Sequence, residues 1–377
     1  MPTVLPAPIA LDIARALGGS DGFAGAIIAA GAMPGIISVP ILGMLSDRWG
    51  RRNTLVGCLI ASGVFGLAQG TATSLTVFFI FRIGQALGAA ALINLVVVVI
   101  ADYWDGDERG RLIGRNAAVI TAAIGVLPAL GGVILQVTGR WQAHVLLYSL
   151  GFIAAYAVWL RLPPPREGAR AAPSTTGRAV PASATSPRLF SPLALLAVLL
   201  GAMFFVLVFG LKLTALPILL ERRFDLGPGQ RGFIVGLPAL VSTPTALLLG
   251  ALYPRIGRRG ALIGGTSAYI VATLAFGWVP AMGVVVVAAL VFGLGDGLAL
   301  PTVQEVAAGA AAPANRGAVI SLAVTGTRVG QSIGPIIVGG LIVSPITVGA
   351  VFLCGTALAS LLLVIVLVAV RTRVLTV

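Results

Sequence analysis

Gly43-Met-Leu-Ser-Asp47-Arg48-Trp-Gly50-Arg51-Arg52 is the stretch that decides the fold of this 377-residue chain, because a related stretch occurs a second time. The second copy, Gly250-Ala-Leu-Tyr-Pro254-Arg255-Ile-Gly257-Arg258-Arg259, lies 207 residues downstream. Two further landmarks repeat at the same offset: Gly88 corresponds to Gly295, and Pro128 corresponds to Pro335. An offset shared by three separate segments predicts that the chain consists of two copies of one unit.

The composition indicates the class of protein. Hydrophobic residues make up 58% of the chain and charged residues only 10%, whereas soluble domains have about 45–50% apolar and about 25% charged residues. The apolar runs are about 18–25 residues long, which is the length that a helix needs to cross the hydrocarbon core of a bilayer. The sequence therefore predicts an all-α polytopic membrane protein.

Eleven full membrane spans are predicted from the apolar runs and the breaks between them. They lie near residues 22–42, 53–70, 75–101, 113–137, 143–162, 193–220, 230–252, 259–277, 283–305, 316–343 and 347–370. By the repeat offset, residues 4–17 are the outer end of a first helix. At ~1.5 Å per residue they cover only ~20 Å, so this first helix is N-terminally truncated. A late start codon or a fragment is the direct explanation, and a genuinely shortened helix is the alternative.

The predicted organisation has three parts. Residues 1–162 form an N-terminal helical bundle, residues 163–190 a cytoplasmic linker, and residues 191–377 a C-terminal helical bundle. The linker begins with Pro163-Pro164-Pro165 and is rich in Pro, Ala, Ser, Thr and Gly, a composition that cannot bury a core.

The net charge of +13 is interpreted as an orientation signal for the membrane, and nucleic-acid binding is not expected. Alternate loops carry very different numbers of basic residues, seventeen on one side and four on the other. Because cationic loops stay in the cytoplasm, the side with seventeen is predicted to be inside. The loops with four hold Arg140, Arg222, Arg223 and Arg231.

Several classes of function have no supporting residues in the sequence. Cys58 and Cys354 lie in apolar segments of different halves and are interpreted as small packing residues. His144 is the only histidine and cannot form a metal site alone. No Gly-x-x-x-x-Gly-Lys-Ser/Thr stretch occurs, which argues against the use of ATP, and no group of residues indicates an enzyme. No cofactor is expected.

The repeated stretch resembles the signature between the second and third helices of the major facilitator superfamily, matched at every fixed position. Arg82-Ile-Gly-Gln85-Ala-Leu-Gly88 resembles the signature of that family's fourth helix, with Ala86 where Gly is more usual. Gly125-Val-Leu-Pro128-Ala-Leu-Gly131-Gly132 resembles the fifth-helix signature of the drug:proton antiporter branches, but it has Leu127 where that motif has Gly. The resemblance covers essentially the whole chain except its start. It implies a fold of two pseudo-symmetric six-helix bundles.

A conformational latch is expected from the first signature. Asp47 would face the N-terminus of a neighbouring helix, whose exposed N–H groups favour negative charge; the resemblance suggests the helix that begins near residue 316. Arg51 is expected to pair with Asp102. The alternative is that this loop only supplies positive charges for orientation. The predicted latch residues are Gly43, Asp47, Arg48, Gly50, Arg51, Arg52 and Asp102.

A substrate or proton cavity is predicted from polar residues inside or beside the apolar spans. A buried cation is costly in lipid and is expected to face a cavity or a partner, so Arg82 is either a proton-coupling residue or an arginine bonded to helix carbonyls. Asp296 and Arg328 lie near the middle of their spans and are expected to pair with each other, as a proton site or as a structural pair. Lys212 is expected near the outer face, and Glu305 at the rim. The candidate set is Asp12, Arg82, Gln85, Asn94, Lys212, Asp296, Arg328 and Gln331.

A seam between the two halves is predicted at two proline positions flanked by glycines. Proline kinks a helix and small residues let helices approach closely, although a purely packing role is equally compatible. The residues are Gly125, Pro128, Gly131, Gly132, Gly334 and Pro335.

The predicted function is a secondary transporter that works by alternating access. We expect proton-coupled export of small lipophilic compounds by a monomer in a bacterial-type inner membrane, with substrate, protons and lipid as its partners. One rival is an uptake symporter or facilitator for an organic anion, because Arg82, Lys212 and Arg328 could bind a carboxylate. A second rival, motivated by the short first helix, is a non-transporting sensor or truncated remnant.

Overall fold

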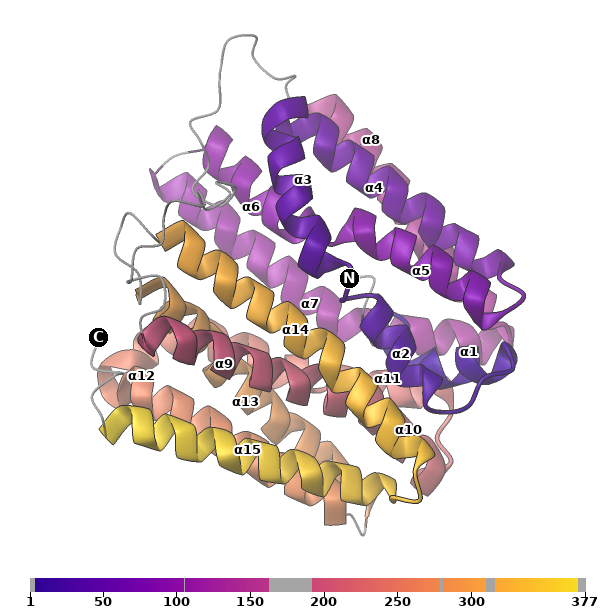
Figure 1. Ribbon diagram of the computed structural model, residues 1–377, viewed down its shortest axis with the longest axis vertical. Coiled ribbons are helices and arrows are strands. Elements are labelled where there is room, and N and C mark those ends of the chain that lie inside the picture. Colours follow the sequence, from indigo (N-terminus) through magenta and orange to yellow (C-terminus); the bar gives the residue numbers. More distant parts are fainter. Residues whose placement is uncertain (1–3, 105, 163–191, 279–280, 310–315, 372–377) are drawn as a thin grey trace.

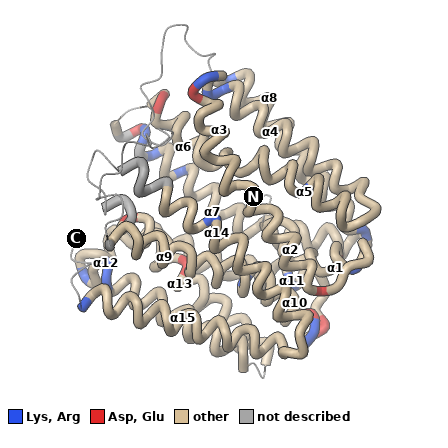
Figure 2. The backbone as a smooth tube through the Cα atoms, viewed as in Figure 1, with Lys and Arg blue, Asp and Glu red and all other residues tan. Residues whose placement is uncertain are grey.

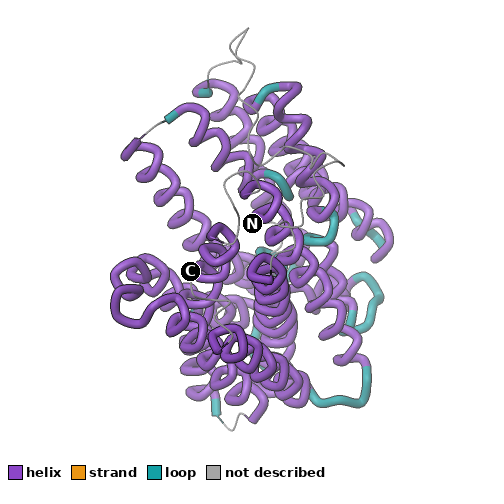
Figure 3. Tube along the Cα trace, turned by 60° about the vertical axis from the view of Figure 1, so that its left-hand side comes forward, coloured by secondary structure: helices purple, strands orange, loops and turns teal. Residues whose placement is uncertain are grey.

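A computed structural model of the chain describes residues 4–104, 106–162, 192–278, 281–309 and 316–371, so the predicted linker lies outside the described residues. Every regular element in these ranges is a helix (Figure 3), and the helices form a bundle (Figure 1). In the N-terminal half they are η1 (Ala7–Ile9), α1 (Ala10–Ala16), α2 (Phe23–Ala30), α3 (Gly35–Trp49), α4 (Arg51–Ala68), η2 (Gln69–Thr71), α5 (Leu75–Ala89), α6 (Leu92–Tyr103), α7 (Gly106–Thr138), η3 (Trp141–Ser149) and α8 (Leu150–Arg161).

The helices of the C-terminal half follow the same pattern. They are α9 (Pro192–Val206), the π-helical η4 (Leu207–Ala215), α10 (Leu216–Phe224), α11 (Pro228–Gly236), α12 (Pro238–Trp278), α13 (Met282–Gly309), α14 (Arg316–Val343) and α15 (Val348–Arg371). Among the described residues, nine helices are long and apolar enough to cross a membrane. The prediction of an all-α membrane protein is confirmed.

The expected loop around Asp47 is almost entirely helical. Residues up to Trp49 belong to α3 and Arg51 already belongs to α4, so the connection is the single residue Gly50 with φ 87°. Gly257, at the same place in the second copy, has φ 67° inside α12. Glycine adopts positive φ without the steric cost of a Cβ atom. A tight reversal without a longer loop is therefore possible at both positions.

The same two junctions each carry an ion pair between an arginine and a carboxylate. Arg51 Nε lies 3.0 Å from Asp102 Oδ2, and Arg258 Nη2 lies 2.7 Å from Glu305 Oε1. Glu305 is thus at the rim, as expected, but it is paired. The two arginines are related by the 207-residue offset, whereas the two acids are 203 residues apart, so the junctions share the arginine and the type of contact but not the position of the acid.

Charged residues gather at the two ends of the bundle, with few between them (Figure 2). We call the end that carries Arg51 and Arg258 the basic side. The opposite end, which carries Asp12, Arg15, Asp21, Glu221, Arg222 and Arg231, is called the network side. The largest group of buried apolar residues includes Ile9, Ile27 and Phe78 from the N-terminal half and many residues of α9, η4 and α13. This core therefore crosses the boundary between the halves.

Candidate functional site

The two halves meet along two equivalent helix pairs, α2 with α14 and α7 with α11. A Cβ atom added at Gly25 would lie 2.0 Å from the carbonyl oxygen of Pro335, and one at Gly232 would lie 2.3 Å from that of Pro128. Gly25 and Gly232 are themselves related by the repeat offset. Contact this close between backbones is possible only for glycine, so these positions define a seam between the halves.

A second set of close approaches lies further toward the network side. An added Cβ atom at Gly132 would lie 2.1 Å from the Pro228 carbonyl oxygen, and one at Gly339 would lie 2.4 Å from that of Gly22. The Gly229 N–H donates to Gln136 Oε1 across the seam at 3.0 Å. Of the predicted seam residues, Gly125 also faces the other half, near Ala239, whereas Gly131 packs on Leu5 and Gly334 on Val206 within their own halves. The structure is thus closed on the network side.

Lys212 and Asp296 form a buried ion pair in the middle of the C-terminal half. Lys212 Nζ lies 2.5 Å from Asp296 Oδ2, and the side chains are only 7% and 9% exposed. The Tyr269 hydroxyl donates to Asp296 Oδ1 at 2.7 Å. Asp296 lies at the midpoint of α13, about 20 Å from each end at ~1.5 Å per residue. A carboxylate, an ammonium and a phenol are thereby held together at the centre of a membrane span.

The expected partner of Asp296 was wrong. Arg328 donates to Gln331 Oε1 at 3.2 Å and to the Ala90 carbonyl oxygen at 3.1 Å. The cation that pairs with Asp296 is Lys212, which was expected near the outer face. The reason is local: η4 is a π-helix around Lys212, and such a bulge changes the direction in which a side chain projects. Arg328 instead bridges the seam, because Ala90 belongs to the N-terminal half.

The surroundings of the Lys212–Asp296 pair are aromatic and closely packed. The Lys212 ammonium lies 5.5 Å from the centroid of Phe292, and the Phe292 and Tyr269 rings are 4.7 Å apart. Glycines on α13 allow this, since a Cβ atom at Gly295 would lie 3.0 Å from the Tyr269 ring and one at Gly293 2.2 Å from the Pro238 carbonyl oxygen. Apolar walls make the charge interaction stronger and any loss of one partner more costly.

A second polar cluster is centred on Arg82, a fully buried side chain on α5. Its Nη1 donates to Gln85 Oε1 at 2.9 Å and to the Tyr148 hydroxyl at 3.4 Å, and its Nε donates to the Ile27 carbonyl oxygen at 3.3 Å. Gln69 Nε2 also donates to Gln85 Oε1, at 2.9 Å. Arg82 is therefore bonded to a helix carbonyl and neutral groups, with no carboxylate among its bonded partners in the described residues.

His144 adjoins the Arg82 cluster, since the centroid of its ring lies 6.1 Å from that of Tyr148. Four polar atoms of this cluster are buried without a hydrogen-bond partner among the described residues. They are Gln69 Oε1, Arg82 Nη2, Gln85 Nε2 and His144 Nε2. Buried donors without acceptors carry a desolvation penalty that a ligand can relieve. Tyr269 and the cluster members Gln69, His144 and Tyr148 were not singled out from the sequence as site residues. Asn94 is half-buried on α6.

The basic side holds the residues expected to form a latch. The side chain of Arg51 is largely buried and forms ion pairs with Asp102 and Asp47. It also donates a hydrogen bond to Ser46 Oγ at 2.5 Å. The Arg52 guanidinium lies 5.4 Å from the centroid of the Trp159 ring, and Arg48 is exposed. A Cβ atom added at Gly43 would have no atom within 4 Å, so this glycine is not required by close packing here. The side chains at the N-terminus of α14 lie outside the described residues, so contact of Asp47 with that helix stays a prediction.

Asp12, expected in the cavity, instead lies in the network of ion pairs on the network side. Its two carboxylate oxygens accept from Arg231 Nη2 at 2.8 and 3.0 Å. In the same network, Asp21 accepts from Arg15 and from Arg222. Asp12 was predicted as a member of the substrate or proton cavity, and the structure instead pairs it with Arg231 of the other half.

The stability that Asp21 contributes is expected to be lost only in strong acid. Hydrogen bonds from Arg15 lower the pKa of Asp21 below its ordinary 3.8. A lowered pKa in the folded state means that the contribution is complete above pH ~4 and disappears as the pH falls through the lower folded-state value. We expect the difference in Tm between wild type and Asp21→Asn to be constant from pH 5 to 8 and to be lost only below pH 3.8, as the pH falls through the lowered pKa of Asp21 in the folded state. A difference that already shrinks between pH 7 and 5 would contradict this assignment.

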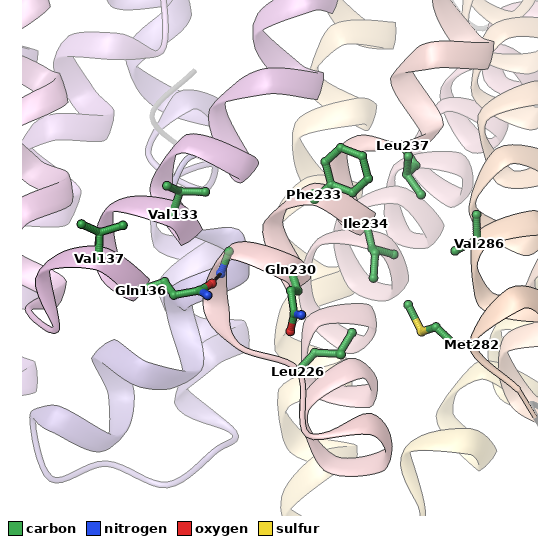
Figure 4. Close-up of a pocket in the computed structure, with 11 residues that line it drawn as sticks. Val133, Gln136, Val137, Leu226, Gln230, Phe233, Ile234, Leu237, Met282 and Val286 are labelled. Atoms are coloured by element: carbon green, nitrogen blue, oxygen red, sulfur yellow. Dashed lines mark hydrogen bonds between the residues drawn. The ribbon is translucent and has the colours of Figure 1, made fainter.

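An apolar cavity of about 650 Å³ lies on the network side of the seam. Val133, Gln136 and Val137 of α7 line one wall (Figure 4), and residues of α11 and α13 line the others, among them Phe233, Ile234 and Met282. The two glutamines supply its polar atoms, and one of these, Gln136, is bound to Gly229. A cavity of this size and character accepts a small apolar molecule or an acyl chain.

Comparisons with known proteins agree with this architecture. The chain is 26% identical over 353 residues to the class D tetracycline resistance protein of Salmonella ordonez, a match that covers 90% of this chain and 86% of that protein. It is 31% identical over 121 residues to citrate exporter 1 of Aspergillus niger, which is 32% of this chain but only 23% of that protein. The solved structure of the nucleoside transporter NupG (D323A mutant) superposes with a TM-score of 0.73 at 15% identity, covering 97% of this chain and 95% of the other.

A family model supplies the assignment. It matches residues 3–335 and, in a second match, residues 198–375, so that the matched segments cover nearly the whole chain and both halves. Together with the two equivalent helix junctions and the two equivalent seam contacts, this shows that the chain belongs to the Major Facilitator Superfamily and is a multi-pass membrane transporter.

Proposed function

We propose that this transporter exports small, largely apolar compounds in exchange for protons, with the basic side in the cytoplasm. The observation that carries the proposal is the Lys212–Asp296–Tyr269 group at the centre of the C-terminal half. Protonation of Asp296 would remove its charge and release the Lys212 ammonium. A change of protonation would therefore change the contacts between η4 and α13. The excess of arginine on the basic side supports the orientation.

The substrate class follows from the scarcity of polar groups between the spans. Sugar sites need several hydrogen-bonding side chains, whereas an apolar substrate needs few. The similarity to a tetracycline resistance protein over 90% of this chain supports a drug-like substrate. In this orientation the described conformation is sealed toward the outside of the cell.

The test is substrate-triggered proton movement in proteoliposomes with an imposed pH gradient, using tetracycline and a panel of lipophilic cations and neutral drugs. Wild type is expected to move protons only when a substrate is added. Asp296→Asn is expected to reduce the flux to background. Glu305→Gln is the matched control, since Glu305 lies on the same helix but its side chain is 37% exposed. Substrate movement in wild type without proton movement would contradict the coupling.

A second candidate, an organic-anion carrier, is favoured by the Arg82 cluster. Arg82 Nη2 and Gln85 Nε2 are two buried nitrogens without partners among the described residues, and they could donate one hydrogen bond to each oxygen of a carboxylate group. The partial similarity to a citrate exporter points the same way. Counterflow of radiolabelled citrate or benzoate, lost in Arg82→Gln, would favour this candidate, and the absence of counterflow in wild type would exclude these anions.

A further inference from the structure

Six charged residues on the network side form one continuous set of ion pairs across the seam. Three belong to the N-terminal half and three to the C-terminal half, and each half supplies partners to the other. Arg231 binds Asp12, Arg222 Nη2 lies 2.6 Å from Asp21 Oδ2, and Arg15 pairs with Glu221. The two remaining pairs lie within a half: Arg15 Nε lies 2.8 Å from Asp21 Oδ1, and Arg231 Nη1 lies 2.9 Å from Glu221 Oε2.

Burial distinguishes Arg231 from the other members of this network. The Arg231 side chain is 2% exposed, whereas those of Arg15 and Arg222 are 46% and 38% exposed. Exposed ion pairs in water contribute little, but a buried guanidinium without its carboxylates is strongly unfavourable. Arg231 Nη1 and Nη2 are both used, one for Glu221 of its own half and the other for Asp12 of the opposite half.

The position of Arg231 couples this pairing to the seam. It lies on α11 between Gly229 and Gly232, the glycines that contact Gln136 and Pro128 of α7. The charged segments of α1 and α10 lie next to each other at this end of the bundle (Figure 2). Any movement that opens the network side must separate α11 from α7 and the C-terminal half from α1. It therefore breaks the Arg231–Asp12 pair and brings the buried guanidinium into a new environment.

We propose that Arg231 is the residue that holds the transporter closed on the network side, through its pair with Asp12, and that its release is required for opening on that side. The inference rests on membership of a transporter family and on the contacts above. It depends neither on proton coupling nor on the identity of the substrate, so it can fail or hold independently of the proposed function. Glu221 belongs to the same half as Arg231, so separation of the halves would leave this pair in place and the guanidinium partly compensated.

The experiment measures the distance across the network side by spin labels. Cysteines replace the exposed Thr73 and Ile346, one in each half, in a background with Cys58→Ser and Cys354→Ser. In wild type, most molecules are expected to show a short distance between the two labels, which corresponds to the conformation closed on the network side. Arg231→Gln is expected to raise the population with the long distance by about tenfold or more, since truncation of one partner of a buried charge pair has large effects.

The control is Arg223→Gln, which removes an exposed arginine of α10 outside the network and is expected to keep the wild-type distances. If Arg231→Gln does not fold, Asp12→Asn carries the same test, because it leaves Arg231 paired with Glu221. Wild-type distances in folded Arg231→Gln or Asp12→Asn would overturn the proposal. An equal shift in Arg223→Gln would also overturn it, since the effect would then belong to surface charge in general.

Discussion

Asp296→Asn is expected to destabilise the protein and to abolish proton-coupled transport. The substitution keeps the shape of the side chain but removes the charge that faces the Lys212 ammonium at 2.5 Å. Because both side chains are more than nine-tenths buried, the ammonium is left without compensation in an aromatic environment. Removal of one partner from a buried ion pair costs about 3–5 kcal/mol. Thermal unfolding in detergent measures the stability, and proton flux in proteoliposomes measures the coupling.

A double variant separates the structural role of the pair from its functional role. Replacement of a buried ion pair by apolar residues of similar volume is often neutral for stability. Lys212→Met combined with Asp296→Leu is therefore expected to recover most of the lost Tm while proton flux stays at background. Recovery of both quantities would show that the pair is structural only. Wild-type flux in Asp296→Asn itself would remove the central support for proton coupling through this site.

The sequence was sufficient to predict the class of fold because that class depends on features that repeat along the chain. Apolar runs of membrane length gave the spans, and the 207-residue offset gave the two halves. In the part of the chain that the structure describes, ten of the expected spans correspond to the nine membrane-length helices, since the spans near 230–252 and 259–277 are joined through Gly257. The pair of Arg51 with Asp102 was expected from the family resemblance, and the structure contains it.

The partners of the buried charges could not be predicted in the same way. Asp296 and Arg328 are of opposite charge and lie at similar depth, yet Asp296 binds Lys212, and Arg328 reaches across the seam to Ala90. Depth along a helix follows from residue counting, but the direction of a side chain depends on helix rotation, and the π-helix at Leu207–Ala215 alters that rotation. Arg231 is a second example. From the sequence it was counted among four loop arginines, but in the structure it is one of the most buried side chains.

Gly339→Ala is expected to shift the transporter strongly away from the conformation closed on the network side. The new Cβ atom would lie 2.4 Å from the Gly22 carbonyl oxygen, and Gly22 belongs to the opposite half. Neither group is the end of a flexible side chain, so the α2 and α14 backbones must separate. Overpacking of this kind costs about 1–3 kcal/mol, and a difference of that size between two conformations changes their ratio by roughly 5–150-fold.

Gly340→Ala is the matched control, since it lies on the same helix one residue further and no atom would approach within 4 Å of its Cβ. Any general effect of alanine on helix stability is common to both variants. The distance between labels at positions 73 and 346 is expected to lengthen in Gly339→Ala and to stay at the wild-type value in Gly340→Ala. Export is expected to fall in Gly339→Ala alone, because a transporter that cannot seal the network side leaks its coupling gradient or stalls. Equal distances and equal export in the two variants would show that the α2–α14 contact does not control closure. The glycines of the seam would then serve packing within a conformation and not the choice between conformations.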